Sequence, residues 1–187
     1  MQNNVLRIIL TSPRSVFTTQ SLAMLSGISD AQALTQALHY YAKRGELLNP
    51  HRGIYCKPGY KAEEMACAII PPSYISLEYV LQRSGVTFQY DSTITSICSR
   101  TREYEIDRQH YSFRQINPMI WMNMSGIRQI DNVAIACKER AFLDMLYLSC
   151  GQCYFDNLNS IDKRIVAELL PCYSSNSLVQ RVKELLK

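Results

Sequence analysis

Residues 1–61 consist of short apolar segments separated by residues that stop helices or form turns, and this pattern most restricts the fold. Residues 5–10 are mostly apolar and Pro13 follows them, which predicts a short amphipathic helix. Thr18 is a candidate N-cap for a second helix, and Gly27 stands where a helix end favours a left-handed residue. The predicted order is therefore helix, glycine turn, helix.

A third helix is expected to begin at Ser29, whose hydroxyl can cap free backbone amides while Gln32 completes a capping box. Leu34, Leu38 and Tyr41 then recur at spacings of four and three, which places them on one buried face. The opposite face is rich in neutral hydrogen-bonding groups: Gln32, Thr35, Gln36, His39, Tyr40 and Lys43. Such a face suits base edges in a major groove, as in a recognition helix, and it equally suits a solvated surface.

A small basic hairpin is predicted directly after this helix. Gly45 ends the helix, and two apolar pairs, Leu47-Leu48 and Ile54-Tyr55, flank the turn-forming residues 49–53. A hairpin in this position is typical of a wing, which predicts a winged helix-turn-helix DNA-binding domain in residues 1–61. The alternative is a winged helix that mediates protein contacts.

The charge distribution agrees with DNA binding by this domain. Residues 1–61 hold seven Lys or Arg and two acids, a net charge of +5, whereas the remaining 126 residues hold thirteen Lys or Arg and fourteen acids, a net charge of −1. Only one end of the chain is therefore suited to a polyanion. The residues expected to contact DNA, through bases or phosphates, are Thr18, Thr19, Ser29, Gln32, Thr35, Gln36, His39, Tyr40, Lys43, Arg44, His51, Arg52 and Lys57.

The composition is that of an ordinary globular protein, with 47% hydrophobic and 19% charged residues. The sequence has neither a membrane-spanning apolar run nor an N-terminal run long enough for a secretory signal, so a cytoplasmic protein without membrane contact is expected. The cysteines are odd in number and lack framework spacing, which predicts thiols. Cys150 and Cys153 have the separation of redox and zinc motifs, but no second pair accompanies them.

Residues 62–187 are expected to form a larger α+β domain with a mixed or antiparallel sheet. A short helix or linker is predicted over 63–70, and Pro71-Pro72 breaks it. Further helices are expected over 74–83, 139–148, 161–170 and 178–186, and β-branched or aromatic segments predict strands over 93–99, 104–107, 111–116 and 132–137.

No catalytic residue, metal ligand or cofactor site is predicted. Glu103, Glu105 and Asp107 alternate, so they could project from one face of a strand as a divalent-metal site requires. A nuclease of the restriction-fold type would also need a lysine two residues after one of these acids, and the sequence has none there. The solvated face of a half-exposed strand explains the same pattern. Phosphate loops, paired helical histidines and nucleophile elbows are also missing from the sequence. Asp144 lies among apolar residues, so it is expected to make a structural hydrogen bond or ion pair.

Three segments stand out by their order and spacing: KRGELLNPHRGIYCKPGY, PPSYISLEYVLQRSGV and VAIACKERAFLDMLYL. Together they resemble the AbiEi family of antitoxins. The first segment, with residues 52–55, is similar to the family's helix end and wing, and the second is similar to the opening of its second domain. VAIACKERAFLDMLYL is similar to a later strand and helix, in which the characteristic positions are Glu139, Ala141, Leu143 and Asp144. The resemblance covers about residues 15–150, and the tail after Leu170 has no counterpart in the family pattern.

The resemblance implies a transcriptional repressor that acts as the antitoxin of a two-gene operon. It would bind double-stranded DNA at its own promoter, at paired half-sites arranged as inverted repeats, and would counteract a nucleotidyltransferase-like toxin without a stable complex. One alternative is a winged-helix regulator whose second domain senses a small ligand. A DNA-processing enzyme is a more distant alternative.

Overall fold

The computed structural model describes residues 2–149 and 153–186, with side chains from Val5 onward. The chain is α+β, as expected, and forms two compact units, Met1–Pro71 and Pro72–Lys187. The division falls after Pro71, inside the range from Gly59 to Ser73 in which the sequence predicts a boundary, and ten residues beyond the limit at residue 61 assigned to the first domain. The helix α4 (Ala62–Ile69) belongs with the first unit, because the buried Glu64 carboxylate accepts hydrogen bonds from backbone nitrogens at the start of β1 (Val16–Thr18).

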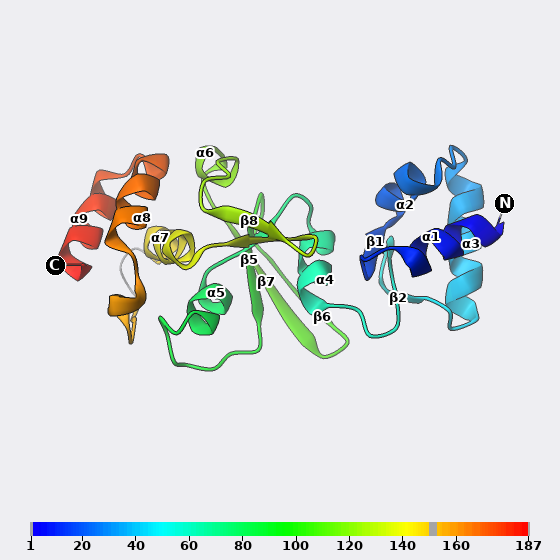
Figure 1. Cartoon of the computed structure of the whole chain (residues 1–187), viewed down its shortest axis with the longest axis horizontal. Helices are drawn as coiled ribbons and strands as arrows, with labels where there is room; N and C mark the ends of the chain where they lie inside the picture. Colours follow the sequence, from blue (N-terminus) through cyan, green and yellow to red (C-terminus); the bar gives the residue numbers. More distant parts are fainter. Residues whose placement is uncertain (1, 150–152, 187) are drawn as a thin grey trace. The chain divides into compact units, whose positions relative to one another are not determined.

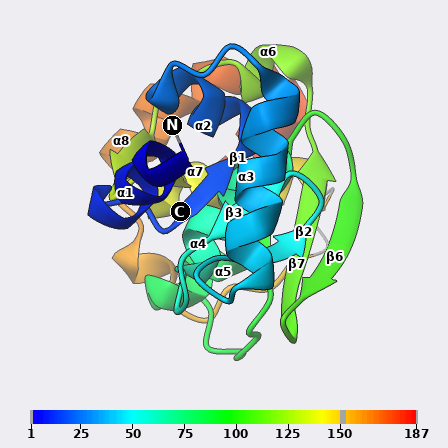
Figure 2. The ribbon, with the colours of Figure 1, turned by 90° about the vertical axis from the view of Figure 1, so that its right-hand side faces the viewer.

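The first unit combines helices with a three-stranded antiparallel sheet of order β1-β3-β2 (Figures 1 and 2). Its other elements are α1 (Gln2–Thr11), α2 (Thr19–Ser26), α3 (Ala31–Lys43), β2 (Leu48–His51) and β3 (Ile54–Cys56). The core joins one face of each of the first three helices to the sheet and contains Val5, Ile9, Phe17, Leu22, Leu34, Ala37, Leu38, Tyr41, Leu47 and Tyr55.

Helix boundaries in the first unit follow local capping. Thr18 caps α2 as predicted, its hydroxyl accepting from the Ser21 nitrogen, and Gly27 ends that helix with φ 67°. The capping box predicted from Ser29 is wrong: Asp30 is the N-cap of α3 and accepts from the nitrogens of the second and third helical residues. A carboxylate at this end also interacts favourably with the helix dipole.

The second unit contains a six-stranded mixed sheet of order β6-β7-β5-β4-β9-β8, in which β4–β9 and β5–β7 are parallel (Figure 1). Its strands are β4 (Tyr74–Ile75), β5 (Ile94–Cys98), β6 (Arg102–Ile106), β7 (Gln109–Gln115), β8 (Ile127–Ile130) and β9 (Val133–Ala136). Its helices are α5 (Glu78–Arg83), α6 (Pro118–Trp121), α7 (Lys138–Leu148), η1 (Leu158–Ser160), α8 (Lys163–Leu169), η2 (Leu170–Tyr173) and α9 (Asn176–Leu185). In the described part of the chain, no helix is long and apolar enough to cross a membrane.

The helix predicted over 74–83 is wrong in its first part. Tyr74 and Ile75 form β4, which pairs with β5 on one side and with β9 on the other, and the helix begins only at Glu78. The apolar spacing of this segment does not distinguish a buried strand from a helix, so long-range pairing decides it. Strand β8 was not predicted, because its exposed Arg128 and Gln129 lack an apolar pattern.

A hydrogen-bonded ion pair lies at the centre of the second unit. Asp144 and Arg140, both on α7, are fully buried, and Arg140 Nε lies 3.2 Å from Asp144 Oδ1. The carboxylate also accepts from the hydroxyls of Tyr173, Ser76 and Tyr74, at 2.6, 2.8 and 3.1 Å. The predicted structural partner of Asp144 is therefore confirmed, and burial raises the pKa of both tyrosines.

Candidate nucleic-acid interface

Helix α3 separates a buried face from a polar one. Leu34, Ala37, Leu38 and Tyr41 pack in the core, and each is at most 5% exposed. On the other side, four exposed residues follow one another at helical spacings of four, three and four, and we call them the polar stripe: Gln32, Gln36, His39 and Lys43. Because residues at these spacings share a face, their side chains form one continuous row along α3. Figure 2 shows this helix along its full length.

The other residues near α3 that are predicted to contact DNA differ in their exposure and in the hydrogen bonds that they make within the fold. Thr35 is half-buried, and its hydroxyl donates to the Ala31 carbonyl at 2.7 Å. Ser29 is exposed and directly precedes the N-cap of α3. The Thr18 hydroxyl accepts the capping hydrogen bond of α2, so it already has a structural role within the first unit. Tyr40 is exposed, and its hydroxyl accepts a hydrogen bond from Arg44.

The β2–β3 hairpin is tighter than the sequence predicts. Strand pairing extends to His51 and Ile54, so only Arg52 and Gly53 form the connection, and Gly53 takes the left-handed φ of 75° that the turn requires. A register shift places one extra residue in β2, where the Asn49 side-chain amide donates to the carbonyls of His51 and Ile54. Arg52 is therefore held, exposed, at the tip of a hairpin fixed on both sides.

The hairpin is fastened to the start of α2. The backbone nitrogen and the hydroxyl of Thr19 both donate to the Gly53 carbonyl, at 2.9 and 3.1 Å. Thr19 thus positions the tip carrying Arg52, a role that its place in the sequence does not reveal. His51 is half-buried in β2, with Nδ1 3.2 Å from the Arg52 carbonyl oxygen.

Two predicted cations make intramolecular contacts that sequence reasoning missed. Arg44 is exposed, pairs with Glu46 at 2.6 Å and donates to Tyr40 at 2.8 Å. Exposed ion pairs are weak, so this guanidinium can exchange partners. Lys57 is half-buried, and its Nζ donates to the carbonyls of Leu10 and Ser12 at 3.2 and 2.6 Å. Lys57 therefore satisfies carbonyls at the end of α1, and a phosphate would have to compete for it.

Among the described residues, the acidic side chains of the second unit do not gather into a metal site. Glu103 and Glu105 are exposed on β6, and Asp107 lies in the following turn with positive φ. Over residues 2–149 and 153–186, no three His, Cys, Asp or Glu side chains are grouped as metal ligands.

The described cysteines are thiols outside any disulfide: Cys56, Cys67, Cys98, Cys137, Cys153 and Cys172. Burial raises the pKa of the Cys98 and Cys137 thiols. Cys153 accepts a hydrogen bond from Ser149, and Cys150, the other cysteine of the CGQC segment, lies outside the described residues.

Comparison with known proteins adds no assignment: the chain matches no protein-family model and no curated protein. The features of the first unit that bear on function are the polar stripe and the hairpin tip with Arg52.

Proposed function

We propose that the chain is a sequence-specific DNA-binding transcriptional repressor whose residues 1–61 act as a winged helix-turn-helix. The polar stripe carries the proposal, because it gives α3 an uninterrupted row of hydrogen-bonding side chains opposite its core-facing side. In this reading α2 and α3, joined through the left-handed Gly27, are the helix-turn-helix, and the β2–β3 hairpin is the wing.

The chemistry of these side chains supports separate roles in DNA binding. The amides of Gln32 and Gln36 can donate to N7 and accept from N6 of adenine in a major groove, and His39 adds a further polar group on the same row. Lys43 and Arg52 are exposed cations, suited to phosphates on either side of the groove. Base readout would therefore come from the first three residues of the stripe, and general affinity from Lys43 at its C-terminal end and from Arg52 in the hairpin.

The biological role proposed here comes from the resemblance to the AbiEi family. The chain would act in the cytoplasm as an antitoxin, repress its own promoter at inverted repeats and counteract a nucleotidyltransferase-like toxin without a stable complex. The family-like segment around Glu139 and Asp144 forms α7, whose buried ion pair organises the second unit. The family pattern at these positions thus coincides with residues that hold the domain together.

The direct test compares promoter and shuffled DNA in fluorescence anisotropy at one salt concentration. Gln36→Ala removes one bidentate base contact, so affinity for the promoter should fall by about one to two orders of magnitude, while affinity for shuffled DNA stays nearly constant. Gln180→Ala, at an exposed glutamine of α9, is the matched control and should change neither. Equal loss on both DNAs would make Gln36 a positioning residue, and no loss would place readout elsewhere.

The antitoxin role needs its own experiment. Expression of the neighbouring gene should arrest growth, and co-expression of this chain should relieve the arrest. A neighbouring gene of unrelated type, or growth arrest that this chain leaves unchanged, would contradict the antitoxin role without touching the DNA-binding proposal.

A second candidate function is a winged-helix regulator whose second unit senses a small ligand. The observation that favours it is a cavity of about 440 Å³ within that unit, lined by both apolar and charged side chains. This volume lies in the range of small-molecule sites in proteins.

A further inference from the structure

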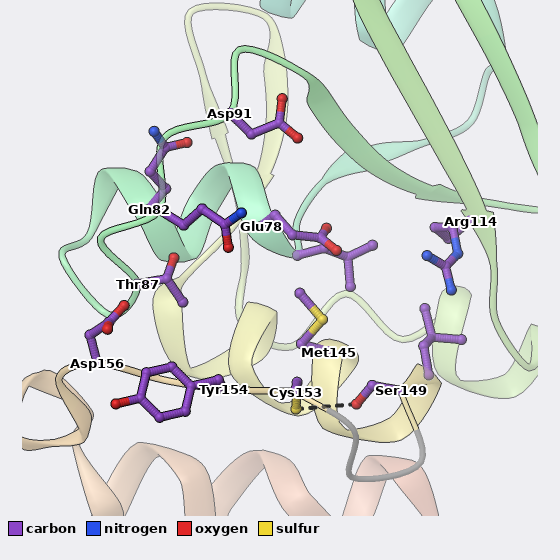
Figure 3. Close-up of a pocket in the computed structure, with 13 residues that line it drawn as sticks. Glu78, Gln82, Thr87, Asp91, Arg114, Met145, Ser149, Cys153, Tyr154 and Asp156 are labelled. Carbon is purple, nitrogen blue, oxygen red and sulfur yellow. Dashed lines mark hydrogen bonds between the residues drawn. The ribbon is translucent and has the colours of Figure 1, made fainter.

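The cavity lies between α5, the chain that follows it, β7 and the end of α7 (Figure 3). Leu77, Met145 and Leu148 form its apolar part, which can pack against an alkyl chain. Two amides and three hydroxyl groups are also among its lining residues. A cavity of this kind suits a ligand with an apolar body and a small number of polar groups.

The charges around the cavity are mainly negative. Its carboxylates are Glu78, Asp91 and Asp156, and Arg114 is its single cation among the described residues. Figure 3 shows Arg114 at the opposite end from Asp156, with Glu78 between them. A hydrogen bond from the Thr93 backbone lowers the pKa of Asp91, which keeps that carboxylate ionised. The whole chain carries a net charge of +4, so this excess of carboxylates is local.

Glu78 has an oxygen without a protein partner. Among the described residues, its Oε2 atom is buried and receives no hydrogen bond. A buried polar atom in this state is unfavourable unless a further group hydrogen-bonds to it, so the free oxygen points to a donor supplied from the cavity.

The position of Glu78 is fixed by the fold. Buried Thr95 donates its hydroxyl to the Ser76 carbonyl at 2.6 Å and accepts from the Tyr79 nitrogen at 3.0 Å, so it clamps the backbone on both sides of Glu78. Between them Leu77 is held at φ 61° and ψ −139°, a conformation that costs a residue with a Cβ about 1–3 kcal/mol. The backbone of Glu78 is therefore fixed at the start of α5, where its side chain lines the cavity.

One exposed aromatic ring lines the cavity beside its carboxylates. Tyr154 is 80% exposed, and Figure 3 shows its ring near Asp156. Asp156 also fastens the chain that follows α5, because its Oδ2 accepts from the Phe88 backbone nitrogen at 2.7 Å. Aromatic faces beside carboxylates attract organic cations through the ring quadrupole.

We propose that this cavity binds a small organic cation, a polyamine or an alkyl guanidine, that donates to Glu78 and lays its alkyl chain on Leu77, Met145 and Leu148. The Tyr154 ring would cover a second positive group near Asp156. This inference rests on the cavity and not on DNA binding, and it specifies the ligand class of the second candidate function.

The test is isothermal titration calorimetry of the full chain with spermidine and with agmatine, at about 0.15 M salt to screen general surface attraction. We expect saturable binding of at least one of them at one site per chain. Glu78→Gln keeps the shape and removes the charge, so it should weaken binding about tenfold or more. Glu103→Gln, at an exposed glutamate of β6 outside the cavity, is the matched control and should bind like the wild type.

Tyr154→Leu supplies an independent variant at an exposed position, and it should weaken binding by a fewfold because the ring is lost. The proposal is overturned if the wild type binds neither amine, if Glu78→Gln binds as tightly as the wild type, or if both glutamate variants lose affinity equally. Binding of an arginine-rich peptide but of neither amine would assign the cavity to a protein segment and also overturn it. DNA affinity measured on the same samples keeps this outcome separate from the proposed function.

Discussion

The buried pair on α7 leads to a quantitative prediction for Asp144→Ala. The five N–H groups of Arg140 all donate: Nε to Asp144, Nη1 to the carbonyls of Asn123 and Ser125, and Nη2 to Tyr74 and the Ile120 carbonyl. The Asp144 carboxylate accepts four hydrogen bonds, from Arg140 and Tyr173 at Oδ1 and from Tyr74 and Ser76 at Oδ2. Truncation would leave a fully buried guanidinium without its counter-charge and would remove the carboxylate acceptor of three hydroxyls, of which Tyr173 keeps a longer contact of 3.4 Å to the Arg140 carbonyl.

Removing one partner of such a pair destabilises a domain by about 3–5 kcal/mol. With a urea dependence of about 2 kcal/mol per molar for a unit of this size, the unfolding midpoint should fall by roughly 2 M. Replacing both charges together, in Arg140→Met with Asp144→Leu, removes the uncompensated charge, so the double variant should be more stable than Asp144→Ala. Glu168→Ala, at an exposed position of α8, is the control and should stay within about 0.5 kcal/mol of the wild type.

Trp121 fluorescence during urea unfolding is the appropriate assay. It is the single tryptophan of the chain and follows Ile120, whose carbonyl accepts from Arg140, so its signal reports on the second unit. A midpoint for Asp144→Ala equivalent to less than about 1 kcal/mol of destabilisation would refute the reasoning, and so would a double variant less stable than the single one.

Three further predictions concern side chains within each unit: two arginines and a lysine of the first, and two buried tyrosines of the second. Replacing Arg44 and Arg52 by alanine should weaken binding to promoter and random DNA alike and lower the salt slope by about one to two units in anisotropy titrations; an unchanged slope would remove both from the phosphate contacts. Lys57→Met should destabilise the first unit by about 1 kcal/mol in thermal melts followed by circular dichroism, because two carbonyls lose their donor, and an unchanged melting temperature would contradict this. Because burial raises the folded-state pKa of Tyr74 and Tyr173, the folded second unit holds their protons more tightly than the unfolded chain, and the Trp121-detected midpoint should fall as pH rises above about 10, whereas a flat profile would disprove it.

Sequence reasoning succeeded where a feature depends on neighbours in the chain. The Thr18 cap, the Gly27 stop and the four-residue spacing of Leu34 and Leu38 each concern residues within one or two turns, and the structure contains all of them. The cap of α3 was misplaced by one residue, because Ser29 and Asp30 are both good caps and only the backbone conformation selects between them.

Features that depend on distant residues were not predictable from one sequence. Asp144 was expected to have a partner, but the donors at Tyr74 and Tyr173 lie 70 and 29 residues away, and nothing in the local pattern identifies them. The same holds for Lys57, which contacts carbonyls 45 and 47 residues earlier. A lysine in a basic segment suggests a phosphate ligand, and only the folded chain reveals its competing role.

The exposure of the polar stripe has an evolutionary consequence. Residues such as Gln36 lie on the opposite side of α3 from Leu34 and Leu38, so their substitution leaves the packing of the first unit unaltered. Thr19, in contrast, fastens the hairpin, and changing it would disturb the scaffold. If the stripe reads the operator, an altered promoter can be followed by single substitutions in it, and related chains can diverge in the DNA they recognise while keeping one fold.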